Sequence, residues 1–134
     1  QAFIKVDDLM HRDDNVPVCT ADTVMSAAIL TMTEKRFGCV GVVDDSGTLI
    51  GIVTDGDLSR HMDDGLMAKR VGDVMTPTPK TIRGGALAAE ALGLMNASQI
   101  TCLFVTENSG GPDAALGVPI GILHVHDILR AGIA

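Results

Sequence analysis

Two short segments of the sequence combine residues that could bind a phosphorylated sugar. The first is Thr54-Asp55-Gly56-Asp57, where a strand-like apolar run ends at a threonine three residues before an aspartate. If a helix begins there, the free amide hydrogens of its first turn favour an anion such as phosphate, and Asp57 can accept hydrogen bonds from the hydroxyls of a ribose. The same spacing also fits a capping box, in which Thr54 and Asp57 satisfy each other's backbone amides.

The second segment is His124-Val125-His126-Asp127, which keeps the aspartate and has histidine in place of the threonine. A protonated imidazole at a helix start could contact a phosphate or a sugar carboxylate, although the helix dipole opposes that protonation. His124 and His126 share one side of an extended strand but diverge once a helix begins, so no shared metal ion is predicted. The alternative for both histidines is a polar, partly solvated helix cap.

The rest of the sequence offers no set of residues for catalysis. Cys19, Cys39 and Cys102 are an odd number of cysteines without metal-binding spacing, and we interpret them as buried, reduced thiols of a cytoplasmic protein. No Ser/His/Asp or Cys/His set converges in the sequence. We therefore predict no catalytic residue and no enzymatic activity for this chain by itself.

Charge and composition disfavour two further classes of protein. The 134 residues include 10 Lys and Arg against 17 Asp and Glu, a net charge of −7, and no Trp or Tyr. Nucleic-acid binding is disfavoured because it needs a basic surface and usually aromatic stacking platforms. No apolar run is long enough to span a membrane, and no signal peptide is found. The chain begins with Gln1 rather than Met, so we expect it to be a piece of a longer polypeptide.

An internal repeat positions the two candidate segments. The opening Val6–Met10 recurs as Val71–Met75, 65 positions later, and Gly51–Leu58 aligns with Gly121–Ile128, 70 positions later. Between these segments, each copy has four apolar residues at the i, i+3, i+4, i+7 spacing of a buried helical stripe. These are Met25, Ala28, Ile29 and Met32 in the first copy and Ala88, Ala91, Leu92 and Met95 in the second.

The elements within each copy follow from its pattern. A short strand near Pro17-Val18 or Lys80-Thr81 precedes the helix, whose start in the first copy is marked by Asp22-Thr23. The apolar runs 39–43 and 102–105 then predict buried strands, each joined to the next strand by a hairpin loop. These loops are 44–47 in the first copy and 108–113, with seven extra residues, in the second.

We therefore predict an α/β (α+β) fold in which two βαββα motifs pack sheet to sheet with pseudo-twofold symmetry, because neither half should bury its helix and sheet faces well alone. The predicted domains are residues 1–66, which include a linker at 63–66, and residues 67–134.

The motifs in this order resemble a known family. The Val-x-Asp-x-Met openings and the Gly-Ile-Val-Thr-Asp-Gly-Asp-Leu ending at residues 51–58 resemble a tandem pair of cystathionine β-synthase (CBS) domains. More narrowly, four segments resemble the C-terminal region of bacterial D-arabinose 5-phosphate isomerases. They are residues 36–43, 54–60, 86–91 and 124–132.

That resemblance implies a regulatory, ligand-sensing module for this chain. In that family an N-terminal sugar isomerase domain of the same chain makes arabinose 5-phosphate for Kdo and lipopolysaccharide synthesis in the cytoplasm. The implied effector is a nucleotide or nucleotide sugar such as CMP-Kdo, no resident cofactor is expected, and the implied assembly is a homodimer or tetramer. Two alternatives stay open: a structural dimerisation module without a ligand, and an adenine-nucleotide sensor from another enzyme or a transporter.

The resemblance also nominates residues that line a ligand cleft in each copy, from the short first strand and from the entry to the second strand. In the first copy these are Pro17, Val18, Cys19, Arg36, Phe37, Gly38 and Cys39, with Thr54 and Asp57. In the second copy they are Pro79, Lys80, Thr81, Gln99, Ile100, Thr101 and Cys102, with His124, His126 and Asp127. Arg36, Lys80 and Arg83 are the candidate cations for a phosphate.

Overall fold

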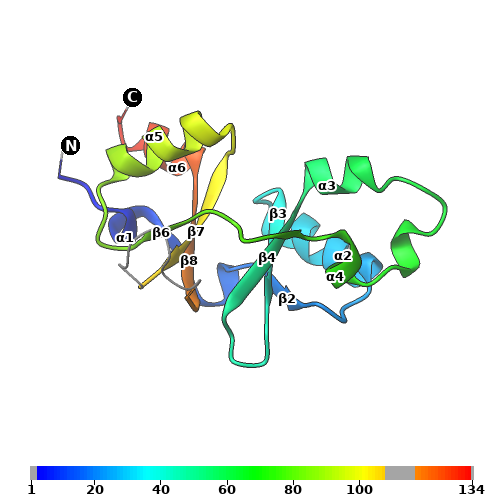
Figure 1. Cartoon of the computed structure of the whole chain (residues 1–134). Helices are drawn as coiled ribbons and strands as arrows, with labels where there is room; N and C mark the ends of the chain where they lie inside the picture. The colour runs from blue at the N-terminus through cyan, green and yellow to red at the C-terminus, as the bar shows by residue number, and fades with distance from the viewer. Residues whose placement is uncertain (1–2, 108–116, 134) are drawn as a thin grey trace. The chain divides into compact units, whose positions relative to one another are not determined.

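The computed structural model describes residues 3–107 and 117–133, which form two compact units (Figure 1). The central unit comprises Pro17–Pro79, and the terminal unit combines the residues up to Val16 with those from Lys80 onward. Each unit contains one four-stranded sheet and its own helices. The predicted α/β class with two related motifs is confirmed.

The sheet of the central unit has the strand order β2-β3-β4-β5. Strands β2 and β3 are parallel because helix α2 connects them, whereas β3 and β4 form an antiparallel hairpin. The elements of this unit are β2 (Val18–Thr20), α2 (Met25–Lys35), β3 (Cys39–Val43), β4 (Leu49–Thr54), α3 (Asp55–Arg60), the 3-10 helix η2 (Leu66–Ala68), α4 (Val71–Val74) and β5 (Thr76–Pro77).

The sheet of the terminal unit repeats this plan with the order β1-β8-β7-β6. Here β6 and β7 are parallel across helix α5, and β7 and β8 are antiparallel. Its elements are α1 (Val6–Leu9), β1 (His11–Arg12), the 3-10 helix η1 (Asp13–Asn15), β6 (Thr81–Arg83), α5 (Ala88–Ser98), β7 (Cys102–Thr106), β8 (Pro119–His124) and α6 (Val125–Arg130).

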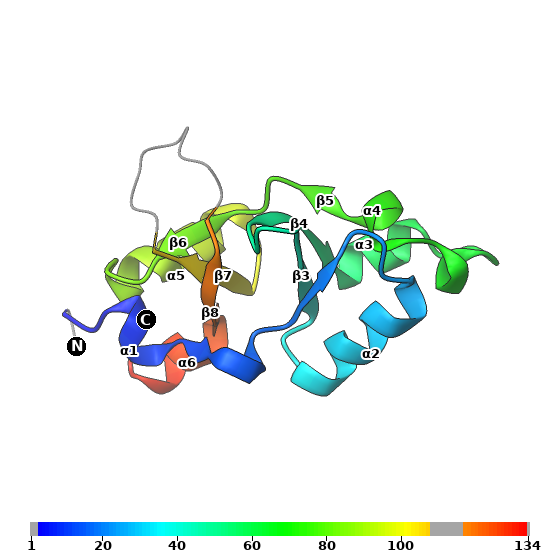
Figure 2. The ribbon, with the colours of Figure 1, turned by 90° about the horizontal axis from the view of Figure 1, so that it is seen from below.

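The opening segment of each sequence repeat packs in the unit formed by the other repeat. Strand β1 pairs with β8, and the Val6 amide donates to the Ala86 carbonyl at 2.8 Å. Correspondingly, β5 runs along β4, as Figure 2 shows, and the Val71 amide donates to the Thr23 carbonyl at 2.8 Å. The compact units and the sequence repeats are therefore two different divisions of the chain.

The predicted apolar stripes face the two cores. Met25, Ala28 and Met32 of α2 are buried and Ile29 is partly buried, and all four predicted residues of α5 are buried. The facing strands β3 and β7 are almost wholly buried, as their short apolar runs predicted. Each fully buried Met or Leu contributes about 1.5–3 kcal/mol by leaving water, so these stripes are the main attachment of each helix to its sheet.

The start of the first long helix differs from its prediction. Helix α2 has Val24 rather than Asp22 or Thr23 at its N-cap, without a side-chain cap, and the Thr23 hydroxyl instead accepts the Thr20 amide at 3.3 Å. The physical reason is a backbone contact with the residues just before α4, because the Lys69 carbonyl accepts the Met25 amide at 2.8 Å. A backbone acceptor from a distant segment thus replaces the expected side-chain cap.

The predicted loops have mixed outcomes. In the first hairpin, Asp44 Oδ1 accepts the amides of Ser46 and Thr48, and Gly47 has a φ of +83°, which confirms a tight turn. The predicted longer loop at 108–113 lies outside the described residues. The segment 63–66 is more than a linker, because Leu66 is 5% exposed and belongs to the central core. No helix among the described residues is long and apolar enough to cross a membrane.

Candidate functional site

Asp57 is the centre of a polar network in the central unit. It is 2% exposed, and its Oδ2 accepts the Thr54 amide at 2.9 Å and the Thr54 hydroxyl at 3.2 Å. Its Oδ1 accepts a hydrogen bond from the Thr76 hydroxyl at 2.7 Å. The Arg60 guanidinium donates to the same oxygen and forms an ion pair with it. Burial alone raises the pKa of Asp57, but the hydrogen bonds from Thr76, Thr54 and Arg60 outweigh it and hold the pKa below its ordinary value.

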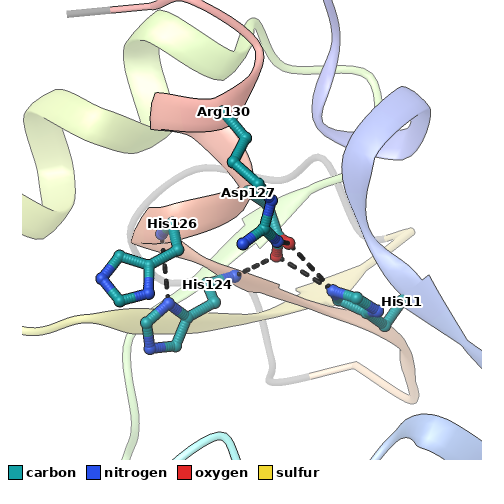
Figure 3. A network of polar contacts seen from close by, with 5 residues as sticks. All are labelled: His11, His124, His126, Asp127 and Arg130. Carbon is teal, nitrogen blue, oxygen red and sulfur yellow. Dashed lines mark hydrogen bonds and ion pairs between the residues drawn. The ribbon is translucent and has the colours of Figure 1, made fainter.

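Asp127 occupies the equivalent position in the terminal unit and is 7% exposed. Its Oδ2 accepts the His124 amide at 2.9 Å, and Arg130 donates to Oδ1 at 2.7 Å. His11 Nε2 lies 3.0 Å from Oδ1 and 3.1 Å from Oδ2, so one imidazole nitrogen contacts both oxygens (Figure 3). The contact with His11 is an ion pair when the imidazole is protonated.

The capping box that was an alternative for Thr54 and Asp57 is present, and the second segment also caps its helix. Thr54 and Asp57 satisfy each other's backbone amides at the start of α3, and His124 and Asp127 do so at the start of α6. Several of the amides expected to be free for an anion are engaged. The Val125 amide donates to the Thr101 carbonyl at 2.8 Å, and the His126 amide donates to His124 Nδ1 at 3.1 Å.

The two histidines do not diverge as expected. The ring centroids of His124 and His126 lie 4.7 Å apart with the planes tilted by 55°. The His126 amide also donates to the His124 ring across the first helical turn, which holds that ring over the start of α6. Burial, and next the neighbouring His126, lower the pKa of His124, so the expected contact of a protonated His124 with an anion is disfavoured. Its Nδ1 is an acceptor, which leaves Nε2 as the donor of the neutral ring.

Residues from the entry to the second strand lie beside the capping residues. In the sheet registers Cys39 is opposite Thr54, and Cys102 is opposite His124. Gly38 has a φ of +76° and leads into β3, while the C-cap of α2 is Arg36 rather than this glycine. A Cβ at Gly38 would lie 3.4 Å from Asp55 Oδ2, so this backbone closely approaches the first turn of α3.

None of the hydrogen bonds described above for the two carboxylates involves the remaining predicted residues. The first strands pair with the second strands through Val18 opposite Gly41 and Thr81 opposite Phe104, and Cys19 is half-buried, which raises the pKa of its thiol to about 11. The three candidate cations, Arg36, Lys80 and Arg83, are exposed. The other predicted residues differ in burial: Pro17 and Pro79 are buried, Phe37 and Ile100 are half-buried, and Gln99 and Thr101 are exposed.

Sequence reasoning missed four residues of the networks: Arg60 and Arg130, which lie one turn after the aspartates, and His11 and Thr76, which come from distant segments. The last two are related by the repeat. They are 65 positions apart, the same offset that relates Val6 to Val71, and each directly follows the methionine of its opening motif. That offset could have shown that the two are equivalent. The crossing of the opening segments places each beside the aspartate of the other repeat.

The fold and the repeated capping networks define a tandem pair of related α/β motifs. Comparison with known proteins identifies the family to which such a pair belongs. The CBS domain model matches residues 6–64 and 71–134, so the chain belongs to the CBS domain family. The arabinose 5-phosphate isomerase KdsD of Pseudomonas aeruginosa is 40% identical over 98% of this chain, which covers 39% of that protein. The chain thus spans less than two-fifths of the length of the curated relatives it matches.

Solved structures agree with this assignment. The structure of CBSX2 in complex with AMP has a TM-score of 0.74 and 30% identity, and the match covers 96% of both chains. An uncharacterized conserved protein from Pyrococcus horikoshii has a TM-score of 0.80 and 22% identity, covering 98% of this chain and 94% of that one. The second likeness shows the fold alone.

Proposed function

We propose that this chain is the regulatory CBS pair of a D-arabinose 5-phosphate isomerase. The observation that carries the proposal is the 40% identity to KdsD over 98% of this chain. The full-length protein would then contain a sugar isomerase domain, act in the cytoplasm and supply Kdo and lipopolysaccharide synthesis. The CBS pair itself performs no catalysis, and the two sequence repeats, residues 1–66 and 67–134, would be its domains.

The proposed effector is a nucleotide or a nucleotide sugar such as CMP-Kdo. Support comes from CBSX2, a 30% identical CBS protein with a solved AMP complex. In this chain each buried aspartate is a carboxylate that can accept the two hydroxyls of a ribose once one of its present partners moves away, and each has an arginine one turn later. Arg60 and Arg130 have side chains that are 64% and 70% exposed, so they can turn toward a phosphate. The residues nominated from the resemblance would line the two sites.

A direct test measures melting curves of the chain with CMP-Kdo, CMP, AMP and ATP at millimolar concentrations. A ligand present at 100 times its Kd stabilises the folded state by about 2.7 kcal/mol. Asp57→Asn and Asp127→Asn, each compared with its own ligand-free curve, identify the unit that binds, because only the variant in that unit loses the shift. Unmoved melting curves with all four compounds would refute the ligand-sensing proposal.

The second candidate function is a structural dimerisation module without a ligand. It is favoured by the internal partners of both carboxylates and by an exposed face of small residues on α5, formed by Ala89, Gly93 and Ala97. A close helix contact suits such a face, and a Cβ at Gly93 would meet nothing within 4 Å. Sedimentation at tens of micromolar tests it: self-association of the wild type that Gly93→Glu abolishes supports this function, and a monomer contradicts it.

A further inference from the structure

Both carboxylate oxygens of Asp127 are engaged by other groups in the described structure. An ionised carboxylate offers about four lone-pair positions. Oδ1 contacts His11 and Arg130, and Oδ2 contacts His11 and the His124 amide, so three donors already share these positions. Two further hydroxyls would make five donors for about four positions. A ribose that donates two hydroxyls to this group must therefore displace a partner that is already there.

The geometry distinguishes among the three partners. The His124 amide belongs to the cap of α6 and is fixed by the backbone. Arg130 contacts only Oδ1, so its departure opens one oxygen. His11 contacts both oxygens through Nε2, at 3.0 and 3.1 Å, so its departure frees acceptor capacity on both oxygens at once. Two neighbouring hydroxyls can each donate to a separate oxygen of the carboxylate in this arrangement.

His11 also connects Asp127 to the start of the chain. It lies on β1, which has two residues and pairs with β8 through His11 opposite Ile122 and Arg12 opposite Gly121. So short a strand has few backbone hydrogen bonds of its own, and the side chain of His11 adds an anchor between β1 and α6. Loss of this contact weakens the attachment of β1 to the terminal unit.

We propose that His11 and a ribose-bearing ligand compete for Asp127, so that ligand binding in the terminal unit releases the anchor of β1. This inference rests on the proposed function, because it takes Asp127 as a ligand-binding group. His11 lies outside the predicted site. The inference gives it two effects: it lowers the affinity of Asp127 for the ligand, and it holds β1 on the terminal unit.

The central unit provides the matched comparison. Thr76 occupies the place of His11 but contacts only Oδ1 of Asp57, while both contacts of Oδ2 come from Thr54. Loss of the Thr76 contact therefore opens only one oxygen. Competition with a two-hydroxyl ligand is thus a property of the histidine and of the terminal unit.

The first experiment measures, by calorimetry, the affinities of AMP and CMP and of their 2′-deoxy counterparts for the wild type, His11→Ala and Thr76→Ala. The ratio of ribo to deoxy affinity cancels effects of the substitution that do not involve the 2′-hydroxyl. We expect His11→Ala to raise this ratio about tenfold, the equivalent of one hydrogen-bonding partner, and Thr76→Ala to leave it unchanged. An unchanged ratio in His11→Ala, or a rise in Thr76→Ala alone, would overturn the proposal.

The second experiment needs no variant and follows amide hydrogen exchange of the wild type with saturating AMP or CMP. We expect slower exchange in residues 121–128 and severalfold faster exchange in residues 10–12. If residues 10–12 slow or stay unchanged while ligand is bound, the competition is refuted and the proposed function stands. If neither nucleotide binds the wild type or His11→Ala, this inference fails; the ligand-sensing function fails with it only if CMP-Kdo and ATP also leave the melting curve unmoved.

Discussion

Thr76 Oγ1 donates a 2.7 Å hydrogen bond to Asp57 Oδ1 and so joins the second sequence repeat to the closing helix of the first. His11 and Asp127 make the equivalent connection in the opposite direction. Each buried carboxylate is thus satisfied partly by its own helix cap and partly by the crossing segment. The contact links local helix capping to the packing of each unit.

Replacement of Thr76 by valine should destabilise the protein, because it removes a donor from a carboxylate that is 2% exposed. Removal of a hydrogen bond to a buried charged group should lower the free energy of unfolding by about 1.5–3 kcal/mol, which urea denaturation measures. Thr33→Val, at an exposed position of α2, is the control and should change it by less than about 0.5 kcal/mol. Equal effects of the two substitutions would contradict this role of Thr76.

Acid should weaken the fold through Asp57. Its pKa in the folded protein is below the ordinary value of 3.8, so its stabilising contribution is complete above that value and is lost as the pH falls toward the lower folded-state pKa. We expect Asp57→Asn to be less stable than the wild type at pH 7 and to lose less stability between pH 5 and pH 3. Urea midpoints of both proteins at three pH values measure this. If the stability of the wild type and of Asp57→Asn falls in parallel with pH, Asp57 does not contribute to the acid sensitivity.

His124 should act in a higher pH range. Its pKa in the folded protein is lowered from 6.5, chiefly by burial, so the unfolded chain takes up the proton first as the pH falls. The stabilising contribution is complete above pH 6.5 and declines below it. His124→Thr, which copies the residue of the first repeat, should flatten the change in melting temperature between pH 8 and pH 5.5. NMR titration of the His124 ring to a pKa above 6.5 would be the opposite result.

Two glycines should respond in opposite directions to alanine. At Gly121 a Cβ would meet the Met10 side chain and lie 2.9 Å from the His11 carbonyl oxygen, so Gly121→Ala should destabilise by about 1–3 kcal/mol. At Gly93, in the middle of α5, a Cβ meets nothing within 4 Å, and Gly93→Ala should stabilise by about 0.5–1 kcal/mol through helix propensity. Thermal denaturation distinguishes them, and stabilisation by Gly121→Ala would refute the close approach of β1.

Local patterns in the sequence were sufficient for the class of fold and for the five main elements of each repeat, but not for the short elements of the opening segments, α1, β1, α4 and β5. The stripe from Met25 to Met32 is visible because helical periodicity relates residues three or four positions apart. The capping boxes of Thr54 with Asp57 and of His124 with Asp127 are equally local, since a cap is made within one turn. Because the two copies align, each element predicted in one half of the chain was also predicted at the equivalent position in the other half.

Only the tertiary structure decided which distant residues complete the two networks. His11 and Asp127 are 116 positions apart, and no local spacing relates them. Their contact exists because each opening segment crosses to the other repeat's unit, where backbone pairing of β1 with β8 and of β5 with β4 fixes its position. The same packing replaced the expected cap at Asp22-Thr23 by the Lys69 carbonyl. Periodicity reports which face of an element is buried, whereas the partner on that face is chosen by the packing of the whole unit.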